Sequence, residues 1–180
     1  LLFNIGNACF RMNQFGQAVF HYRRALRQAP RDTDIRRNLA MAMRQAGAHA
    51  KRPGRFARFA EYLTLREWRF AGGAVAGFVF LSTMILFAAH ARARALAVLI
   101  CGCLLLAAGG TVILGHHAGL SQEAVLTAPE AVRLAPGPAA EKLFDLPEGT
   151  IVRIIESAGA WSQIASGEKR GWLPTSNLLM

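Results

Sequence analysis

Cysteine is scarce in this 180-residue sequence, which contains three. Three cysteines cannot build the disulfide framework of a small secreted protein. Cys9 lies on the apolar face of an expected helix, and Cys101 and Cys103 lie two residues apart within a long apolar run. Side chains two residues apart point to different sides of a helix. We therefore expect neither a disulfide bond nor a metal site at these cysteines.

Catalytic residue types are also missing from the two polar parts of the chain. Residues 121–180 contain no histidine, and the hydroxyl groups of residues 1–69 belong to two threonines and two tyrosines. A nucleophile, a base and an orienting carboxylate therefore do not occur together in either part. The adjacent His116 and His117 are a poor ligand set by themselves. We expect a protein that is not an enzyme and that binds no cofactor and no metal ion.

Acidic residues are few, with 11 Asp and Glu against 21 Lys and Arg. Residues 1–69 carry fourteen basic and four acidic side chains, whereas residues 121–180 carry five and seven. A basic segment beside an apolar one favours attraction to anionic lipid headgroups. Nucleic acid is the alternative partner, but the sequence has no basic recognition helix, zinc-finger or RNP pattern. We therefore expect membrane lipid, and no nucleic acid, among the partners.

Two long apolar runs occupy the middle of the chain. Residues 70–89 and residues 95–115 contain no charged side chain. A helix that crosses a hydrocarbon core about 30 Å thick needs roughly 20 apolar residues. The basic connection at 90–94 is short enough for a tight turn, so residues 70–115 are predicted to form a transmembrane helical hairpin. Such a hairpin places the segments before and after it on the same side of the membrane.

A helical hairpin buried in a soluble core is the alternative interpretation of these runs. Core helices of soluble proteins usually keep polar side chains at a helical period, and neither run shows such a stripe. The spacing Gly73-x-x-x-Gly77 allows close helix packing, for instance of the hairpin against itself. The lack of ionisable groups in both runs argues against a transporter or a proton path.

Residues 51–69 are predicted to connect the first part of the chain to the membrane. Lys51-Arg-Pro-Gly54 is a linker, because proline and glycine interrupt helices. Aromatic and basic side chains then alternate through residues 55–69, with Phe56, Phe59 and Leu63 at helical spacing. Rings at headgroup depth and guanidinium groups near phosphates are typical of an interfacial helix, and equally of ordinary membrane-flanking anchors.

Residues 1–50 show the apolar periodicity of three helices. A turn is predicted at Asn13-Gln14. Asp32 is placed to cap the third helix, and Gly47 is placed to end it. The chain opens within the first helical pattern, so we expect it to be a fragment whose upstream part is missing.

These helices resemble a tetratricopeptide repeat. The resemblance rests on small residues, aromatic residues and a proline in register, although Cys9 and Asn13 replace the usual aromatic residue and glycine. It implies paired helices that present a concave surface to a peptide or a helix. The residues of the repeat signature are Gly6, Ala8, Ala18, Tyr22, Ala25 and Pro30. Arrays normally need about three repeats, so we expect repeats upstream, or support from the membrane or a partner.

An arginine-rich face follows the second helix of this repeat. One hypothesis is that it attracts an acidic partner, and the alternative is that it is simply a solvated face beside a membrane. The candidate partner-binding residues are Arg23, Arg24, Arg27 and Arg31.

After Ser121 the sequence changes to short β-branched runs separated by turns, which favours a compact all-β barrel. The pattern resembles a bacterial SH3-like domain over residues 121–180. The matching residues are Arg133, Pro136, Leu146-Pro-Glu-Gly149-Thr150, Gly159-Ala-Trp161, Gly171-Trp172, Pro174 and Ser176-Asn-Leu178.

Trp161 and Trp172 are the candidate ligand-binding residues of this barrel. The resemblance implies that exposed aromatic residues bind proline-rich or peptidoglycan-type peptides, although the eukaryotic acidic-aromatic motif for proline-rich ligands is absent. The alternative is that both tryptophans are core and closure residues of the barrel.

The order of these segments gives the expected fold class: a multidomain membrane protein with an all-α helical repeat (1–50), a transmembrane hairpin and a small all-β SH3-like barrel. This order resembles the BatE-like family of bacterial aerotolerance-operon proteins. The resemblance implies an inner-membrane scaffold in envelope stress tolerance, beside von Willebrand-type Bat proteins and a MoxR-type ATPase. The alternatives are a module that binds or senses peptidoglycan, and an accessory subunit of an enzyme encoded elsewhere.

The side of the membrane is predicted differently by charge and by resemblance. Seven basic residues flank the hairpin on the side of the polar segments, against Arg92 and Arg94 in the turn. The positive-inside rule then puts both polar segments in the cytoplasm. The resemblance implies the reverse, with both in the periplasm and a signal peptide lost. Because a cleaved signal peptide fixes orientation before these charges matter, we favour the periplasm.

Overall fold

The computed structural model describes residues 1–48, 55–90 and 92–180, and the predicted linker Lys51–Gly54 lies outside the described residues. The side chains of residues 56–58 and 116–121 also lie outside them, and with them the predictions for Phe56, His116 and His117. The chain divides into two compact units. The first joins Leu1–Gly54 with Gly119–Met180, and the second is Arg55–Ala118.

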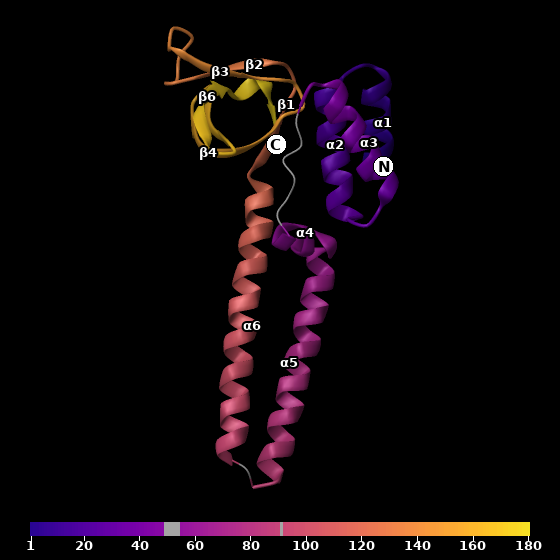
Figure 1. The fold of residues 1–180 in the computed structure, drawn as a ribbon, viewed down its shortest axis with the longest axis vertical. Coiled ribbons are helices and arrows are strands. Elements are labelled where there is room, and N and C mark those ends of the chain that lie inside the picture. The colour runs from indigo at the N-terminus through magenta and orange to yellow at the C-terminus, as the bar shows by residue number, and fades with distance from the viewer. Residues whose placement is uncertain (49–54, 91) are drawn as a thin grey trace. The chain divides into compact units, whose positions relative to one another are not determined.

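Three helices form the N-terminal part of the first unit, as the apolar periodicity predicts (Figure 1). They are α1 (Leu2–Arg11), α2 (Phe15–Gln28) and α3 (Thr33–Gln45). A left-handed residue, Asn13 with a φ of 58°, turns the chain between α1 and α2. Asp32 caps α3, because its Oδ1 accepts hydrogen bonds from the backbone N–H groups of Asp34 and Ile35 at 2.9 and 3.1 Å. Gly47, with a φ of 73°, follows the end of α3, so these local predictions are confirmed.

The core of the repeat is built around Tyr22, whose side chain is 1% exposed. A Cβ at Gly6 would lie 2.6 Å from the ring of Tyr22, so the glycine lets α1 approach α2 closely. Most of the predicted signature is buried or half-buried in this way. Ala8 is the exception, because it is exposed on α1, two positions beyond Gly6 and therefore on another side of the helix.

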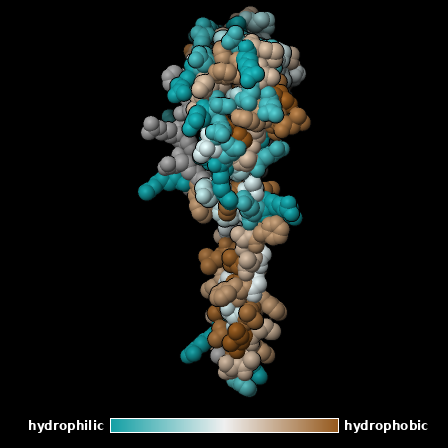
Figure 2. Space-filling view, turned by 90° about the vertical axis from the view of Figure 1, so that its right-hand side faces the viewer, coloured by the Kyte–Doolittle hydropathy of each residue, from teal (hydrophilic) through white to brown (hydrophobic). Residues whose placement is uncertain are grey.

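The second unit contains two helices that are long and apolar enough to cross a membrane: α5 (Leu65–Ala88) and α6 (Arg92–Ser121). The most apolar 18-residue window of each helix contains no buried residue, and Figure 2 shows mostly apolar surface along them. An apolar surface of this size is expected to be covered by lipid or protein. These observations favour the membrane interpretation over a hairpin in a soluble core.

The boundaries of the second unit differ from the predicted ones. The segment at 55–69 is not one helix, because α4 (Arg55–Tyr62) ends before a capping box starts α5. In that box the hydroxyl of Thr64 accepts from the N–H of Glu67, and the carboxylate of Glu67 accepts from the N–H of Thr64. The turn at 90–94 is also shorter than predicted, since α6 begins at Arg92.

The glycines that pack the hairpin also differ from the prediction. A Cβ at Gly102 would lie 2.6 Å from Cγ1 of Val79, so this glycine sets the close approach of α6 to α5. A Cβ at Gly73 or Gly77 would meet no atom of the described residues within 4 Å. The interpretation of Gly73-x-x-x-Gly77 as the contact of the hairpin with itself is therefore wrong, because both glycines lie on a face of α5 with open space in front.

An antiparallel sheet of seven strands curls into a barrel in the C-terminal part of the first unit (Figure 1), in the order β3-β2-β6-β5-β4-β1-β7. Its core contains Leu126, Val132, Ile164 and Leu173, each at 0% exposure. The elements are β1 (Glu123–Leu126), β2 (Glu130–Arg133), β3 (Lys142–Leu146), β4 (Ile151–Ala158), β5 (Trp161–Ser166), β6 (Lys169–Pro174), the short 3₁₀ helix η1 (Thr175–Asn177) and β7 (Leu178–Leu179). The predicted fold class of helical repeat, apolar helix pair and small barrel is confirmed, although β1 was not predicted.

Candidate binding surfaces

The two candidate tryptophans lie on one outer face of the barrel. In the pairing of β5 with β6, Trp161 is opposite Pro174 and Gln163 is opposite Trp172. Directly opposed residues of an antiparallel pair project to the same side of a sheet. We call these four residues the aromatic face. All four are half-buried, so neither tryptophan is a fully enclosed core residue.

Two side chains of opposite charge extend the aromatic face along the sheet. Arg133 of β2 is opposite Trp172, and Glu156 of β4 is opposite Gln163. Nη1 of Arg133 donates a hydrogen bond to the carbonyl oxygen of Ala140 at 2.8 Å, which holds the guanidinium group in place. Flat rings beside an amide and two opposite charges suit an extended peptide or a glycopeptide, because rings contact apolar or sugar surface and polar groups bind the backbone.

A second surface is a pocket of about 250 Å³ on the repeat. Oδ1 of Asn7 accepts hydrogen bonds from the hydroxyl of Tyr22 at 2.7 Å and from Nδ2 of Asn38 at 3.2 Å. Burial raises the pKa of Tyr22, which therefore stays a hydrogen-bond donor at neutral pH. We call this cavity the repeat pocket. Its lining residues are Asn7, Phe10, Arg11, Tyr22, Asn38 and Met41.

Sequence reasoning missed the polar residues of the repeat pocket. Asn7 and Arg11 lie four residues apart on α1, and Asn38 comes from α3. The spacing of the first two places them on one helix face, which was a detectable signal. Two amides and a guanidinium group that converge on an apolar floor can bind the backbone or the carboxylates of a peptide.

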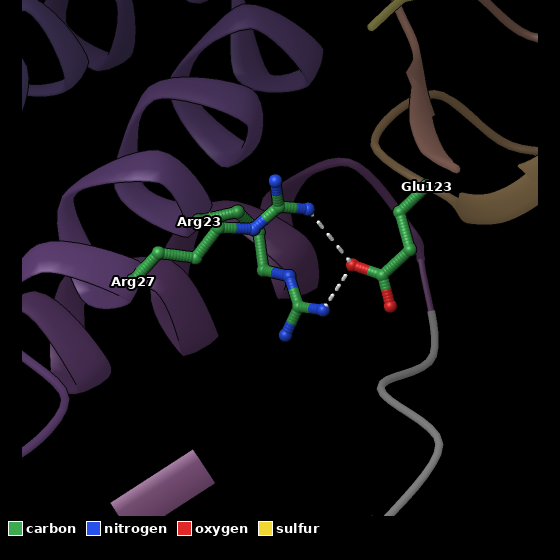
Figure 3. A network of polar contacts seen from close by, with 3 residues as sticks. All are labelled: Arg23, Arg27 and Glu123. Atoms are coloured by element: carbon green, nitrogen blue, oxygen red, sulfur yellow. Dashed lines mark hydrogen bonds and ion pairs between the residues drawn. The ribbon is translucent and has the colours of Figure 1, made fainter. Parts of the chain in front are cut away.

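Two of the predicted arginines contact an acidic residue of the same chain. Nη2 of Arg23 and Nη2 of Arg27 both donate to Oε2 of Glu123 in β1, the second at 3.4 Å (Figure 3). The arginine face therefore engages Glu123 through Arg23 and Arg27. Arg31 is exposed.

Arg24 has a different environment, because its guanidinium group lies over the ring of Phe20 at 5.4 Å. Its neighbour His21 is half-buried, and burial together with the charge of Arg24 lowers the pKa of His21. His21 is therefore neutral at pH 7. The positive charge of this region of α2 comes from the arginines alone.

Comparison with known protein families agrees with this architecture. A model of the tetratricopeptide repeat matches residues 1–32, which include α1 and α2. A model of the bacterial SH3 domain matches residues 128–178, which include β2 to β6. No curated protein matches the chain significantly. The chain therefore carries a tetratricopeptide repeat and a bacterial SH3 domain, separated in the sequence by two helices that are long and apolar enough to cross a membrane.

Proposed function

We propose that this protein is a membrane-tethered scaffold of the bacterial envelope and not an enzyme. The observation that carries the proposal is the presence of two separate binding surfaces, the repeat pocket and the aromatic face, in one chain with an apolar helix pair. In this proposal the repeat pocket holds an extended segment of a partner protein, and the aromatic face holds peptidoglycan. The helix pair keeps both ligands at the membrane.

The partners that we propose follow from the order of the modules. A helical repeat, an apolar hairpin and an SH3 domain in this order support a place in a BatE-type aerotolerance complex, beside von Willebrand-type Bat proteins and a MoxR-type ATPase. The repeat pocket is the surface that would bind one of these proteins. The side-chain amides of Asn7 and Asn38 can form hydrogen bonds with the backbone N–H and C=O groups of a bound segment. Such bonds suit a protein segment better than a lipid or a nucleotide.

Peptidoglycan is the ligand that we propose for the aromatic face. Its peptides are extended and carry charged ends, and its sugars offer apolar faces to aromatic rings. Trp161 and Trp172 supply such rings, while Arg133 and Glu156 supply one charge of each sign. A protein peptide of the same extended form is the alternative ligand, and in that case the wild-type protein would stay in the supernatant when purified sacculi are sedimented.

Replacement of Trp161 or Trp172 by alanine is expected to weaken binding of the full-length protein to isolated sacculi at least tenfold. Buried aromatic anchors typically contribute about 2 kcal/mol or more to an interface, and about 1.4 kcal/mol corresponds to a factor of ten. The measurement is co-sedimentation of the detergent-solubilised protein with purified sacculi. Leu143→Ala is the matched control, because Leu143 is 43% exposed on β3 and lies outside the aromatic face. Binding that both tryptophan variants retain would contradict peptidoglycan recognition by this face.

The side of the membrane is tested by alkaline phosphatase fused after Met180 and, separately, at His90 in the turn. We expect activity from the fusion after Met180 and none from the fusion at His90, because the proposal puts the repeat and the barrel in the periplasm. The reverse result would place both modules in the cytoplasm, where no peptidoglycan is available. Equal activity of both fusions would contradict a membrane hairpin.

A further inference from the structure

The strand β1 is buried on both of its faces, although it belongs to a small barrel. Ala124 and Leu126 of β1 are part of the barrel core. Val125, which points to the opposite side of the strand, is 4% exposed and belongs to the apolar core of the helical repeat. Ile151 of β4 packs against the same core. A strand of a small barrel normally has a solvated outer face, so the helices of the repeat cover the outer face of β1.

Two glycines bring the repeat and the barrel into close contact. A Cβ at Gly16 of α2 would lie under 3.0 Å from the carbonyl oxygen of Leu126. A Cβ at Gly149, in the turn before β4, would lie 3.0 Å from Cβ of Ala46 and 3.4 Å from Cγ2 of Val19. Because real Cβ atoms essentially never come within 3.0 Å of such neighbours, a side chain at Gly16 would force the two modules apart.

The barrel also supplies polar groups that α2 lacks. α2 has no side-chain cap of its own and no acidic residue in its first turn. The first N–H groups of a helix need hydrogen-bond acceptors, and a carboxylate is favourable there because of the helix dipole. Oε1 of Glu148, which precedes β4, accepts a hydrogen bond from the N–H of Gly16. Further along α2, Glu123 binds Arg23 and Arg27.

We infer that the SH3 barrel is the capping partner of the short helical repeat, so that the two fold as one cooperative module into which the apolar helix pair is inserted. The barrel covers the apolar face between α2 and α3, and it caps the first turn of α2 through Glu148. The barrel therefore covers an apolar face that a neighbouring repeat covers in an array of such repeats.

Gly16→Ala tests this inference because docked and undocked helices predict changes of opposite sign. In an undocked α2, alanine is the better helix former, and amide hydrogen exchange of α2 would slow by up to about fivefold. In the docked helix the new methyl group meets the carbonyl oxygen of Leu126, and exchange in α2 and β1 is expected to become at least tenfold faster. The measurement is hydrogen–deuterium exchange with mass spectrometry on the full chain in nanodiscs. Slower or unchanged exchange in α2 would overturn the inference.

Charge reversal gives a second and independent test in the same experiment. Glu123→Arg is expected to speed up amide exchange in both β1 and α2, because the new arginine would repel Arg23 and Arg27, which Glu123 binds in the wild type. Reversal of all three charges, with Arg23→Glu, Arg27→Glu and Glu123→Arg, is expected to restore exchange to within about threefold of the wild type. Asp145→Arg is the matched control, since this exposed carboxylate pairs with Lys142, which lies three residues before it on β3. Faster exchange in β1 without any change in α2 would show that the modules fold independently.

Glu148→Gln is the mildest variant and covers the case in which the others fail to fold. It keeps the size of the side chain and removes its charge at the start of α2. We expect faster exchange of the first amides of α2 and no change in β3. An unchanged first turn of α2 would contradict the capping role of the barrel.

Discussion

Tyr22→Ala is expected to unfold the module of repeat and barrel or to lower its free energy of unfolding by about 3–5 kcal/mol, the range found for buried aromatic residues replaced by alanine. The side chain is 1% exposed, and its ring contacts Gly6 and lies 5.9 Å from the ring of Phe3. Its loss leaves a cavity between α1 and α2 and removes a donor from Asn7. Domain stabilities are about 5–15 kcal/mol, so this is a large fraction of the total. Urea unfolding of the full-length protein in detergent measures the change.

Tyr22→Phe separates the packing of the ring from its hydrogen bond. It keeps the ring and removes the hydroxyl that donates to Asn7, so the expected loss is about 0.5–1.5 kcal/mol. A loss of the same size for both variants would contradict a core built on the ring. A loss below about 1 kcal/mol for Tyr22→Ala would contradict the burial of this residue.

Gly171→Val is expected to weaken the pairing of β6 with β2 and to destabilise the barrel. A Cβ at Gly171 would lie under 3.0 Å from a methyl group of Val132 and 2.8 Å from the carbonyl oxygen of Arg133. Overpacking of a core costs about 1–3 kcal/mol and sometimes more. Here one of the two atoms belongs to the backbone of the neighbouring strand, so we expect the upper end of this range. The readouts are the near-UV circular dichroism of the protein and its urea midpoint.

Ala158→Val is the control for Gly171→Val. It also adds branched side-chain atoms to a strand, but Ala158 is exposed at the end of β4. Exposed substitutions of this kind change stability by about 0.5 kcal/mol or less. Equal effects of the two variants would show that the close contact of β6 with β2 does not limit the size of residue 171.

The helical repeat could be predicted from the sequence because its signals are local. Asp32 caps the third helix through N–H groups two and three residues ahead, and Gly47 ends it through its own backbone angle. The start of the first long apolar helix was missed for a related reason. The aromatic and basic side chains of residues 55–69 form one interleaved pattern in the sequence, whereas the capping pair Thr64 and Glu67 within it starts a new helix.

The barrel shows where sequence patterns stop being sufficient. The strands β4, β5 and β6 alternate or carry β-branched runs, whereas β1 is buried on three consecutive positions and is separated from α6 by the single residue Gln122. A strand that is covered on both faces has no alternation to detect. The shared face of the two tryptophans, by contrast, follows from the tight turn between Ser166 and Lys169, which fixes the register of β5 and β6.

The contacts of the arginine face could not be predicted from the sequence. Arg23 and Glu123 are 100 residues apart, and no periodicity connects α2 with β1. The charge pattern allows an acidic partner, but it carries no information on whether an acidic group that meets these arginines lies in another molecule or in the same chain. Such a choice depends on how the modules pack, which is a property of the fold.

The first unit is built from two segments that are far apart in the sequence, so its two parts are synthesised at different times. The ribosome completes α3 well before it reaches β1, because both apolar helices lie between them in the chain. At about 5–20 residues per second, this interval lasts several seconds. During that time the apolar surface that later covers Val125 is open to solvent, to proteases and to chaperones. Both apolar helices are therefore synthesised before the strand that completes the core of the repeat, and a pause in their synthesis lengthens the exposure of that unfinished core.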